Sequence, residues 1–473
     1  MGKWTTILVA AAGFAAGWIV GRSGVDSRFD GPVESSPGEE SKAADKGGAP
    51  AAGSLFQKDG GFWHQRRTVE SNKHRETLER LTSLPYVTGS QPPAERVGVT
   101  LYDTARAFNG LNLYSSAHRP QAFLMDMKGR VLHKWEYERN SVWPRLAEAD
   151  RNKARRYFRR LHLFENGDLL AVYEYTGIIK LDANSNLLWA HQGWNHHDLD
   201  VDERGRVYVL GRDSDENGRY NLEIGDAPAT PRLVAGRRIF DENITVLNPR
   251  GEVIDKISII ECIENSRYAS LLDMAMYRPG AEPLDLLHPN TVEVFDGSLE
   301  QYSRLYKKGN ILTSFRNVST VAIIDAKQKK LVWALSNAWK CQHDPTLLDS
   351  GRMLVFDNYS GGLRAGGTAL KSRVVEFDPM TQEIFWEFEG TSKAPFFSSL
   401  MGTNHRLPNG NTLISESDYG RVFEVTPDKT IVWEFNNPHT SGENNEFVAA
   451  VPDLIRIPPD FPVAGFVASR DGP

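Results

Sequence analysis

Two histidines of this chain stand at matching places in its sequence. His343 and His197 are each followed by an aspartate, and each lies the same number of residues ahead of a glycine (Gly351 and Gly205) that opens an apolar run. An apolar run after a glycine turn is typical of a short β-strand. A repeated fold would therefore place both imidazole rings at one structural position.

A third histidine and an arginine extend this pattern. His288 begins a His-Pro-Asn motif that ends at Asn290, and Arg316 follows the next apolar run, before His343. Three imidazoles with an open coordination position would suit zinc or copper. The fixed charge of Arg316 instead repels a metal and favours a tetrahedral oxyanion such as phosphate or sulfate. We therefore predict an anion site with no metal and no cofactor, since the sequence has no glycine-rich phosphate loop and no nucleophile elbow.

The other histidines near these motifs fit the pattern less well. Any single loop histidine is more often a structural hydrogen-bonding residue than a functional one. His196 would point away from His197 in an extended segment, so we exclude it from the predicted site. His162 and His405 also precede Asn-Gly turns, but in a different phase, and we predict structural roles for both.

The elements that must position these side chains form a repeat. From about residue 110 onward, the chain repeats a glycine turn, two apolar β-rich runs and a run that in most units ends in tryptophan. Six such units, spaced by roughly 45 to 60 residues, are typical of propeller blades. We predict an all-β, six-bladed β-propeller whose tryptophans fill the space between blades. Residues just before inner strands lie at the mouth of the central channel, so His197, His288 and His343 should converge there.

Two insertions interrupt the repeat. Residues 145–160 have a helical pattern with a basic side, which we interpret as a solvated face, with contact to anionic lipid as the alternative. Residues 261–276 are predicted to be helical from the spacing of their leucines and methionines.

The composition excludes some classes of function. The chain has 473 residues and a net charge of -6, whereas a general nucleic-acid binder carries a basic face. Cys262 and Cys341 can form one disulfide bridge or none, so they do not make a disulfide framework.

The amino terminus has the pattern of a membrane segment. Residues 5–20 are apolar and are stopped by Arg22, which favours an uncleaved anchor over 1–22, with a signal segment as the alternative. Lys3 orients the short end to the cytoplasm, so the propeller would lie in the periplasm or outside the cell, anchored to the inner membrane. We further predict a disordered linker over 23–61, a helical lead-in over 62–109, the propeller over 110–440 and an extension packing on it over 441–473.

Together the blade phrases and channel residues resemble the bacterial arylsulfate sulfotransferase family, which are six-bladed periplasmic propellers that move a sulfuryl group between phenols without a nucleotide donor. The resemblance covers about residues 110–438 and implies an aryl sulfate donor and a phenolic acceptor. It places the family's nucleophilic histidine on His343, its sulfuryl-binding residues on His288, Asn290 and Arg316, and the histidine beside the leaving oxygen on His197.

The mechanism implied by this resemblance is a double displacement. Neutral His343 would attack the sulfur and form a sulfohistidine. His197 would protonate the departing phenolate and later deprotonate the acceptor. The family also places a threonine in the channel, and here Gly402 or Thr403 takes that place depending on the strand register; we assign Thr403 to substrate binding.

Two other classes of function remain open. A membrane-tethered propeller without catalytic activity would act as a scaffold or ligand-binding module, because a fold does not imply a function. A hydrolase or lyase using the same channel is the second alternative. The sequence leaves the oligomeric state open.

Overall fold

The computed structural model describes residues 55–58, 61–65, 96–144, 156–213, 232–234, 237–277, 285–360, 371–391, 394–441 and 447–467. The predicted anchor over 1–22, most of the predicted linker over 23–61 and the charged part of the predicted lead-in helix lie outside these ranges. Within them, no helix combines the length and apolar character that crossing a membrane requires.

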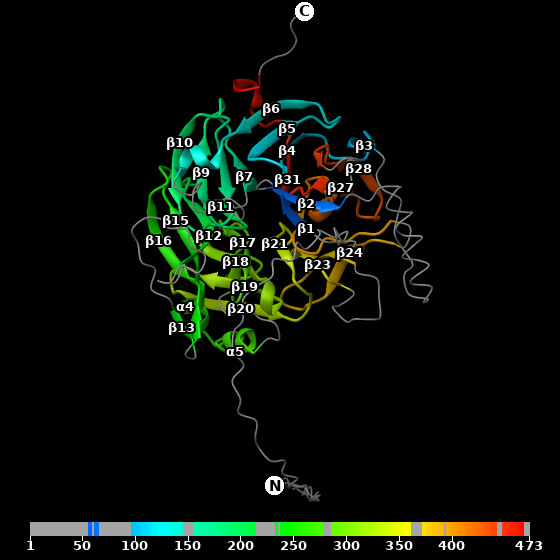
Figure 1. Cartoon of the computed structure of the whole chain (residues 1–473). Coiled ribbons are helices and arrows are strands. Elements are labelled where there is room, and N and C mark those ends of the chain that lie inside the picture. Colours follow the sequence, from blue (N-terminus) through cyan, green and yellow to red (C-terminus); the bar gives the residue numbers. More distant parts are fainter. Residues whose placement is uncertain are drawn as a thin grey trace, which may run out of the picture. The chain divides into compact units, whose positions relative to one another are not determined.

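Six antiparallel sheets form the blades of a β-propeller (Figure 1). From the inner to the outer strand, the first three are β31 (Asp453–Ile457), β4 (Leu111–Ser115), β5 (Gln121–Met125), β6 (Val131–Glu136); β7 (Phe158–Leu163), β8 (Leu169–Tyr173), β9 (Gly177–Leu181), β10 (Leu187–Gln192); and β11 (Leu199–Val201), β12 (Val207–Asp213), β15 (Asp241–Leu247), β16 (Val253–Ser258). The other three are β17 (Pro289–Val294), β18 (Asn310–Phe315), β19 (Thr320–Asp325), β20 (Lys330–Ser336); β21 (His343–Leu347), β22 (Met353–Asp357), β23 (Arg373–Phe377), β24 (Ile384–Glu389); and β25 (Thr403–Arg406), β26 (Thr412–Glu416), β27 (Arg421–Val425), β28 (Ile431–Asn436). The predicted six-bladed fold is confirmed.

The inner strands close into a ring. Each contacts the inner strands of both neighbouring blades, in the order β31, β7, β11, β17, β21, β25 and back to β31. β31 comes from the segment 441–473, which we expected to pack on the propeller as an extension; instead it supplies the innermost strand of the blade that begins with β4. Pairing of β31 with β4 thus joins the two ends of the propeller sequence in one blade and completes the ring.

The ends of the chain also add strands outside the inner ring. β3 (Gly98–Tyr102) pairs with the outer strand β28, so this part of the predicted helical lead-in is extended, because it continues a sheet edge. β1 (Leu55–Lys58), β2 (Gly61–Gln65), β30 (Phe447–Ala449) and β29 (Thr440–Ser441) form a separate sheet, and β13 (Arg232–Val234) and β14 (Arg237–Ile239) form a hairpin.

The hydrophobic core lies between adjacent blades. One cluster, for example, joins Leu354 and Phe356 of β22 to Ile414 of β26 and Phe423 of β27. These runs are apolar on both faces because each blade is covered on both sides by its neighbours.

The tryptophans link consecutive blades, as predicted. Trp135, Trp189, Trp386 and Trp433 stand on outer strands, and each donates its indole N–H to a backbone carbonyl in a turn of the next blade at 2.9–3.1 Å. Each indole therefore combines apolar contact area with a satisfied polar end.

Helices are few and short among the described residues. The predicted helical insertion over 261–276 is confirmed as α4 (Ile259–Glu264) and α5 (Ser270–Met276), and α2 (Arg139–Val142) forms one turn. The helix predicted over 145–160 was wrong for its last residues, because Arg159 and Arg160 lie on the inner strand β7 and are buried.

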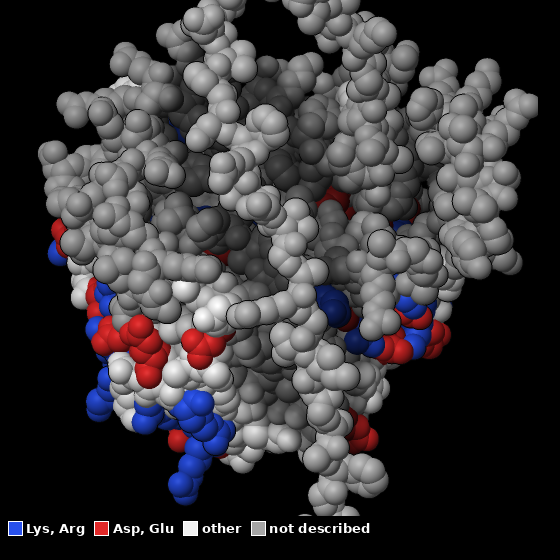
Figure 2. Space-filling model, turned by 60° about the horizontal axis from the view of Figure 1, so that its bottom comes forward, with Lys and Arg blue, Asp and Glu red and all other residues white. Residues whose placement is uncertain are grey.

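The described part of the surface carries charges of both signs. Figure 2 shows Lys and Arg side chains next to Asp and Glu side chains on the described part of the face in view. This mixture agrees with the net charge of -6.

Candidate active site

The three predicted histidines lie where inner strands begin. His197 precedes β11, His288 precedes β17 and His343 is the first residue of β21. β17 and β21 each have a bulge directly after their first paired residue, and His197 and His288 have left-handed backbone angles, with φ of 57° and 55°. Bulges and non-glycine residues with left-handed backbone angles are concentrated at functional sites. Both point a side chain in a direction that a regular strand does not allow.

His196 belongs to the same cluster, so the premise that excluded it was wrong. We had assumed an extended segment, but the left-handed conformation of His197 breaks the alternation of side chains. The Nδ1 atoms of His196 and His197 are 2.8 Å apart, and the ring of His197 lies 4.8 Å from that of His288, centroid to centroid. The imidazole rings of His196, His197 and His288, which come from two blades, therefore form a row in which each ring contacts the next.

His343 is held in one tautomer. Its Nδ1 lies 2.8 Å from Asn358 Oδ1 and 3.0 Å from the carbonyl oxygen of Cys341. The amide of Asn358 is oriented by its nitrogen, which donates to the carbonyls of Ser398 and Met401. Both neighbours of Nδ1 are thus acceptors, so Nδ1 carries the proton. Nε2 keeps its lone pair, and it has no hydrogen-bond partner among the described residues.

Burial and nearby positive charge keep His343 neutral. Burial and the guanidinium of Arg316 lower the pKa of His343 to about 3, with Arg159 and His288 acting in the same direction against the hydrogen bond that Nδ1 donates to Asn358. Arg316 begins the 3-10 turn η2 (Arg316–Val318) directly after β18. A neutral imidazole beside two guanidinium groups combines a nucleophile with groups that stabilise an oxyanion.

His197 is also held neutral. It is buried, and burial together with the charges of His288, His196 and Arg159 keeps its pKa well below the ordinary histidine value. Its nearest carboxylate oxygen given by the structure is Glu174 Oε1, at 3.7 Å from Nδ1, beyond hydrogen-bond distance.

His288 differs because it has a carboxylate partner. Its Nδ1 lies 2.5 Å from Asp285 Oδ2. Burial opposes ionisation of Asp285, but the charge of His288 and this hydrogen bond outweigh it and hold the pKa of the carboxyl below its ordinary value. The backbone carbonyl of Asp285 accepts from the side chain of Asn317, which ties the pair to the turn that carries Arg316.

Asn290 and Thr403, the two other residues predicted to bind substrate, are engaged in the frame of the site. The Asn290 amide nitrogen donates to the carbonyl of Gln342, 2.8 Å away, and so joins β17 to the backbone directly before His343. Thr403 begins β25 and donates its hydroxyl to Ser415 at 2.9 Å, inside its own blade.

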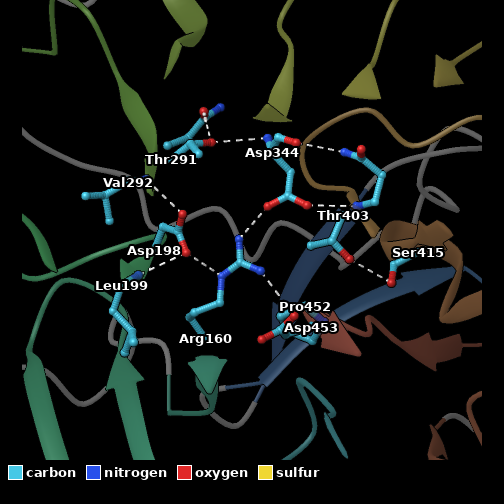
Figure 3. A network of polar contacts seen from close by, with 12 residues as sticks. Arg160, Asp198, Leu199, Thr291, Val292, Asp344, Thr403, Ser415, Pro452 and Asp453 are labelled. Carbon is cyan, nitrogen blue, oxygen red and sulfur yellow. Dashed lines mark hydrogen bonds and ion pairs between the residues drawn. The ribbon is translucent and has the colours of Figure 1, made fainter. Parts of the chain in front are cut away.

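Arg160 gathers three carboxylates around the propeller axis (Figure 3). Its guanidinium lies 2.7 Å from Asp198, 2.8 Å from Asp344 and 3.1 Å from Asp453. Asp198 and Asp344 are the aspartates that follow His197 and His343, so the histidine-aspartate pairs anchor both histidines to one buried cation. The predicted solvated face was wrong for Arg160 because these carboxylates offset the cost of burying its charge.

The three carboxylates do not share this charge equally. Burial opposes ionisation of Asp344, but Arg160 and a backbone N–H from Asn404 hold its pKa below the ordinary value. Burial raises the pKa of Asp198 to about 7, against the opposing effect of Arg160. Asp198 Oδ2 also accepts from the backbone N–H of Val292, so the network extends into β17.

Two of the charges that act on His343 are those of arginine side chains. Among the described residues, no three His, Cys, Asp or Glu side chains are grouped so that they could hold a metal ion. The cations Arg316 and Arg159 act on His343 from two different blades. Positive charge from two arginines near an imidazole suits a bound anion.

Sequence reasoning missed Asn358, Asp285 and Arg159. Asn358 is the first residue after β22, as Arg316 is the first after β18, so the repeat itself marked the position. Asp285 stands three residues before His288 in the stretch Asp-Leu-Leu-His, a weak signal without the fold. Arg159 carried no usable signal, because its basic surroundings were interpreted as a helix.

The comparisons with solved structures find matches of low similarity. A protein of unknown function from Bacteroides caccae is 13% identical, with 74% of this chain and 99% of that chain covered and a TM-score of 0.46. Virginiamycin B lyase from Staphylococcus aureus is 10% identical, with 64% and 85% covered and a TM-score of 0.32. These overlaps are too loose to bear on the chemistry of the site.

The comparison with family models is more informative. No curated protein matches the chain. The model of the family described as Arylsulfotransferase (ASST) matches residues 159–438, which is more than half of the chain and runs from β7 through β28. This range contains each histidine, the asparagine, the arginine and the threonine that the sequence predicted for the site. The chain therefore belongs to the arylsulfotransferase family.

Proposed function

We propose that this protein is a nucleotide-independent sulfotransferase that moves a sulfuryl group from an aryl sulfate to a phenolic or alcohol acceptor through a sulfohistidine on His343. The observation that carries the proposal is the state of His343: Nδ1 is protonated toward Asn358, and the lone pair of Nε2 has no partner among the described residues. A buried neutral imidazole with an available lone pair is the arrangement that nucleophilic catalysis needs.

The first half-reaction uses the charges around this nitrogen. Nε2 of His343 attacks the sulfur, the bond from sulfur to the aryl oxygen breaks, and the sulfuryl group becomes bound to the ring. Arg316 and Arg159 stabilise the negative charge on the sulfuryl oxygens. In the second half-reaction an acceptor hydroxyl attacks the same sulfur and the bond to Nε2 breaks, which restores neutral His343.

Asn358 and Asn290 support the nucleophile without touching the reacting atoms. Asn358 keeps the proton on Nδ1, so the attacking nitrogen is always Nε2. Asn290 holds the carbonyl of Gln342 and so fixes the backbone at the start of β21.

The experiment incubates the full chain with 4-nitrophenyl sulfate, with and without phenol, and follows release of 4-nitrophenol and formation of phenyl sulfate. Intact-mass analysis of protein mixed with donor alone should show an adduct of about 80 daltons, the mass of one sulfuryl group on the nucleophile. His343→Asn should lose the adduct and both half-reactions. Release of 4-nitrophenol without phenyl sulfate would identify a hydrolase, and no release at all would leave the non-catalytic scaffold as the better account.

We also propose that residues 1–22 anchor the chain in the inner membrane, with the propeller on the periplasmic or outer side. The proposal rests on the apolar run over 5–20 and its flanking basic residues. Protease added to spheroplasts should digest the propeller if it lies outside, whereas protection from the protease would place it in the cytoplasm.

A further inference from the structure

We infer that His288, oriented by Asp285, is the residue that carries the proton between the leaving phenolate and the acceptor hydroxyl. This inference rests on the proposed sulfuryl transfer and deepens it, since it assigns a role to Asp285 and moves the acid and base role away from His197. The juxtaposition behind it is the contact of 2.5 Å between Asp285 Oδ2 and His288 Nδ1, next to the ring of His197.

A proton carrier must be stable both with and without its extra proton. The imidazolium form of His288 has an ionised partner, because Asp285 accepts from its Nδ1. An acceptor carboxylate at Nδ1 fixes the tautomer and stabilises the cation that forms during acid and base catalysis. Nε2 is then the nitrogen that gives and takes the proton.

His197 has no carboxylate within hydrogen-bond distance of its Nδ1 among the contacts that the described residues make. Its Nδ1 is 2.8 Å from another imidazole nitrogen, that of His196, and 3.7 Å from the nearest carboxylate oxygen of Glu174. The positive charges of Arg159 and of His288 itself oppose a proton on it. A cation on His197 would therefore have one carboxylate oxygen 3.7 Å away and positive charges around it, whereas a cation on His288 has a carboxylate in hydrogen-bond contact.

Access to substrate also favours His288. The side chain of His288 is 21% exposed, whereas that of His197 is 6% exposed. A group that exchanges protons with an incoming phenol has to reach it. His197, packed against the His288 ring at 4.8 Å, is placed to hold that ring in position.

The groups around His288 come from several elements. Asp285 stands on its own segment, His196 and His197 precede β11, Arg212 lies on β12 and Glu242 lies on β15. Arg212 is stacked over Tyr175, 4.4 Å from the ring centroid, and Glu242 bonds His196 at 3.2 Å. Asp285 is thus the carboxylate in direct contact with the His288 ring.

The proposed step balances in both directions. When sulfur bonds to Nε2 of His343, the bond to the aryl oxygen breaks and that oxygen takes the proton from Nε2 of His288. When the acceptor oxygen attacks the sulfohistidine, its proton returns to Nε2 of His288 and the bond from sulfur to His343 breaks. No oxidant, reductant or further reactant is needed.

The test compares two donors in the full-chain protein. 4-Nitrophenolate is a weak base that leaves without a proton, whereas phenolate is much more basic and needs one. Asp285→Asn should slow sulfohistidine formation from phenyl sulfate by about 10²- to 10³-fold, but from 4-nitrophenyl sulfate by less than about 10-fold. Equal losses for the two donors would overturn the role, since a structural defect does not distinguish leaving groups.

Two further variants keep the result interpretable. His288→Gln should show the same donor dependence, and it carries the test should Asp285→Asn fail to fold; the double variant should lose little more than either single one, because the pair acts as a unit. His197→Gln should affect both donors equally, and a donor-dependent loss in that variant alone would return the role to His197. Wild-type protein that forms no adduct from either donor would instead refute the proposed function itself.

Discussion

His343 and His288 both stand at the start of an inner strand, in adjacent blades, yet their surroundings make them different reagents. Nδ1 of His343 faces the neutral amide oxygen of Asn358, whereas Nδ1 of His288 faces the carboxylate of Asp285. The amide fixes a tautomer without stabilising a cation, which gives a nucleophile. The carboxylate stabilises the cation, which gives a proton carrier. In the proposed function, one neighbouring side chain thus decides which role each histidine takes.

The positions of these histidines depend on the buried guanidinium of Arg160, and removing its charge should have the largest effect on stability. Arg160→Met leaves Asp198, Asp344 and Asp453 buried without their cation, and should lower the free energy of unfolding by about 3–5 kcal/mol. Urea denaturation measures this change. Arg250→Met, which removes an exposed ion pair with Glu252, is the matched control and should leave the urea midpoint close to that of the wild type. Similar small changes in both variants would contradict the supporting role of Arg160.

Replacing Asn358, the acceptor at Nδ1 of His343, with an aspartate should remove the difference between His343 and His288. Asn358→Asp places a carboxylate at Nδ1 of His343 and should raise the pKa of this ring, so that Nε2 is protonated and unreactive as the pH falls. Sulfohistidine formation from 4-nitrophenyl sulfate should drop roughly 10- to 100-fold near pH 6 and recover at higher pH, following the fraction of neutral imidazole. Stopped-flow release of 4-nitrophenol measures the profile.

The control for this variant is Asn184→Asp, which makes the same change in an exposed turn and should leave the profile as in the wild type. A pH profile of Asn358→Asp that matches the wild type would show that Asn358 does not set the protonation of His343.

The smallest expected effect is a change in the pH dependence of stability, caused by Glu242, a buried carboxyl whose pKa responds to the charge of His288. Burial raises the pKa of Glu242 to about 8, against the opposing effect of Arg212, from an unfolded value near 4.5. A carboxyl with a raised folded pKa contributes stability below its unfolded pKa and loses it as the pH rises through the folded value. The melting temperature should therefore fall between about pH 5 and pH 9.

Glu242→Gln should reduce this slope, leaving the part that comes from Asp198, and should stabilise the protein at about pH 9 with little change at about pH 5. Thermal unfolding at the two pH values measures it, and Glu252→Gln on the surface serves as the control. An unchanged slope in Glu242→Gln would assign the pH dependence to other buried carboxyls.

The sequence carried much of the fold because its signals are local. Glycine turns, apolar runs and the tryptophans that end outer strands recur along the chain, and each indole bonds the next blade as the repeat required. Local signals also placed His197, His288 and His343 ahead of inner strands. They failed for Arg159 and Arg160, whose basic surroundings resemble a solvated helix although the residues lie on β7.

By itself, then, the sequence determined how many blades form and which histidines begin their inner strands, because strand period, turns and repeats are written within short segments. Only the tertiary structure decided which partner each imidazole meets and which charges are buried. Arg160 and Asp453 are 293 residues apart and meet because the ring closes. The left-handed turn at His197, which brings His196 into the cluster, likewise follows from packing between blades and not from residue order.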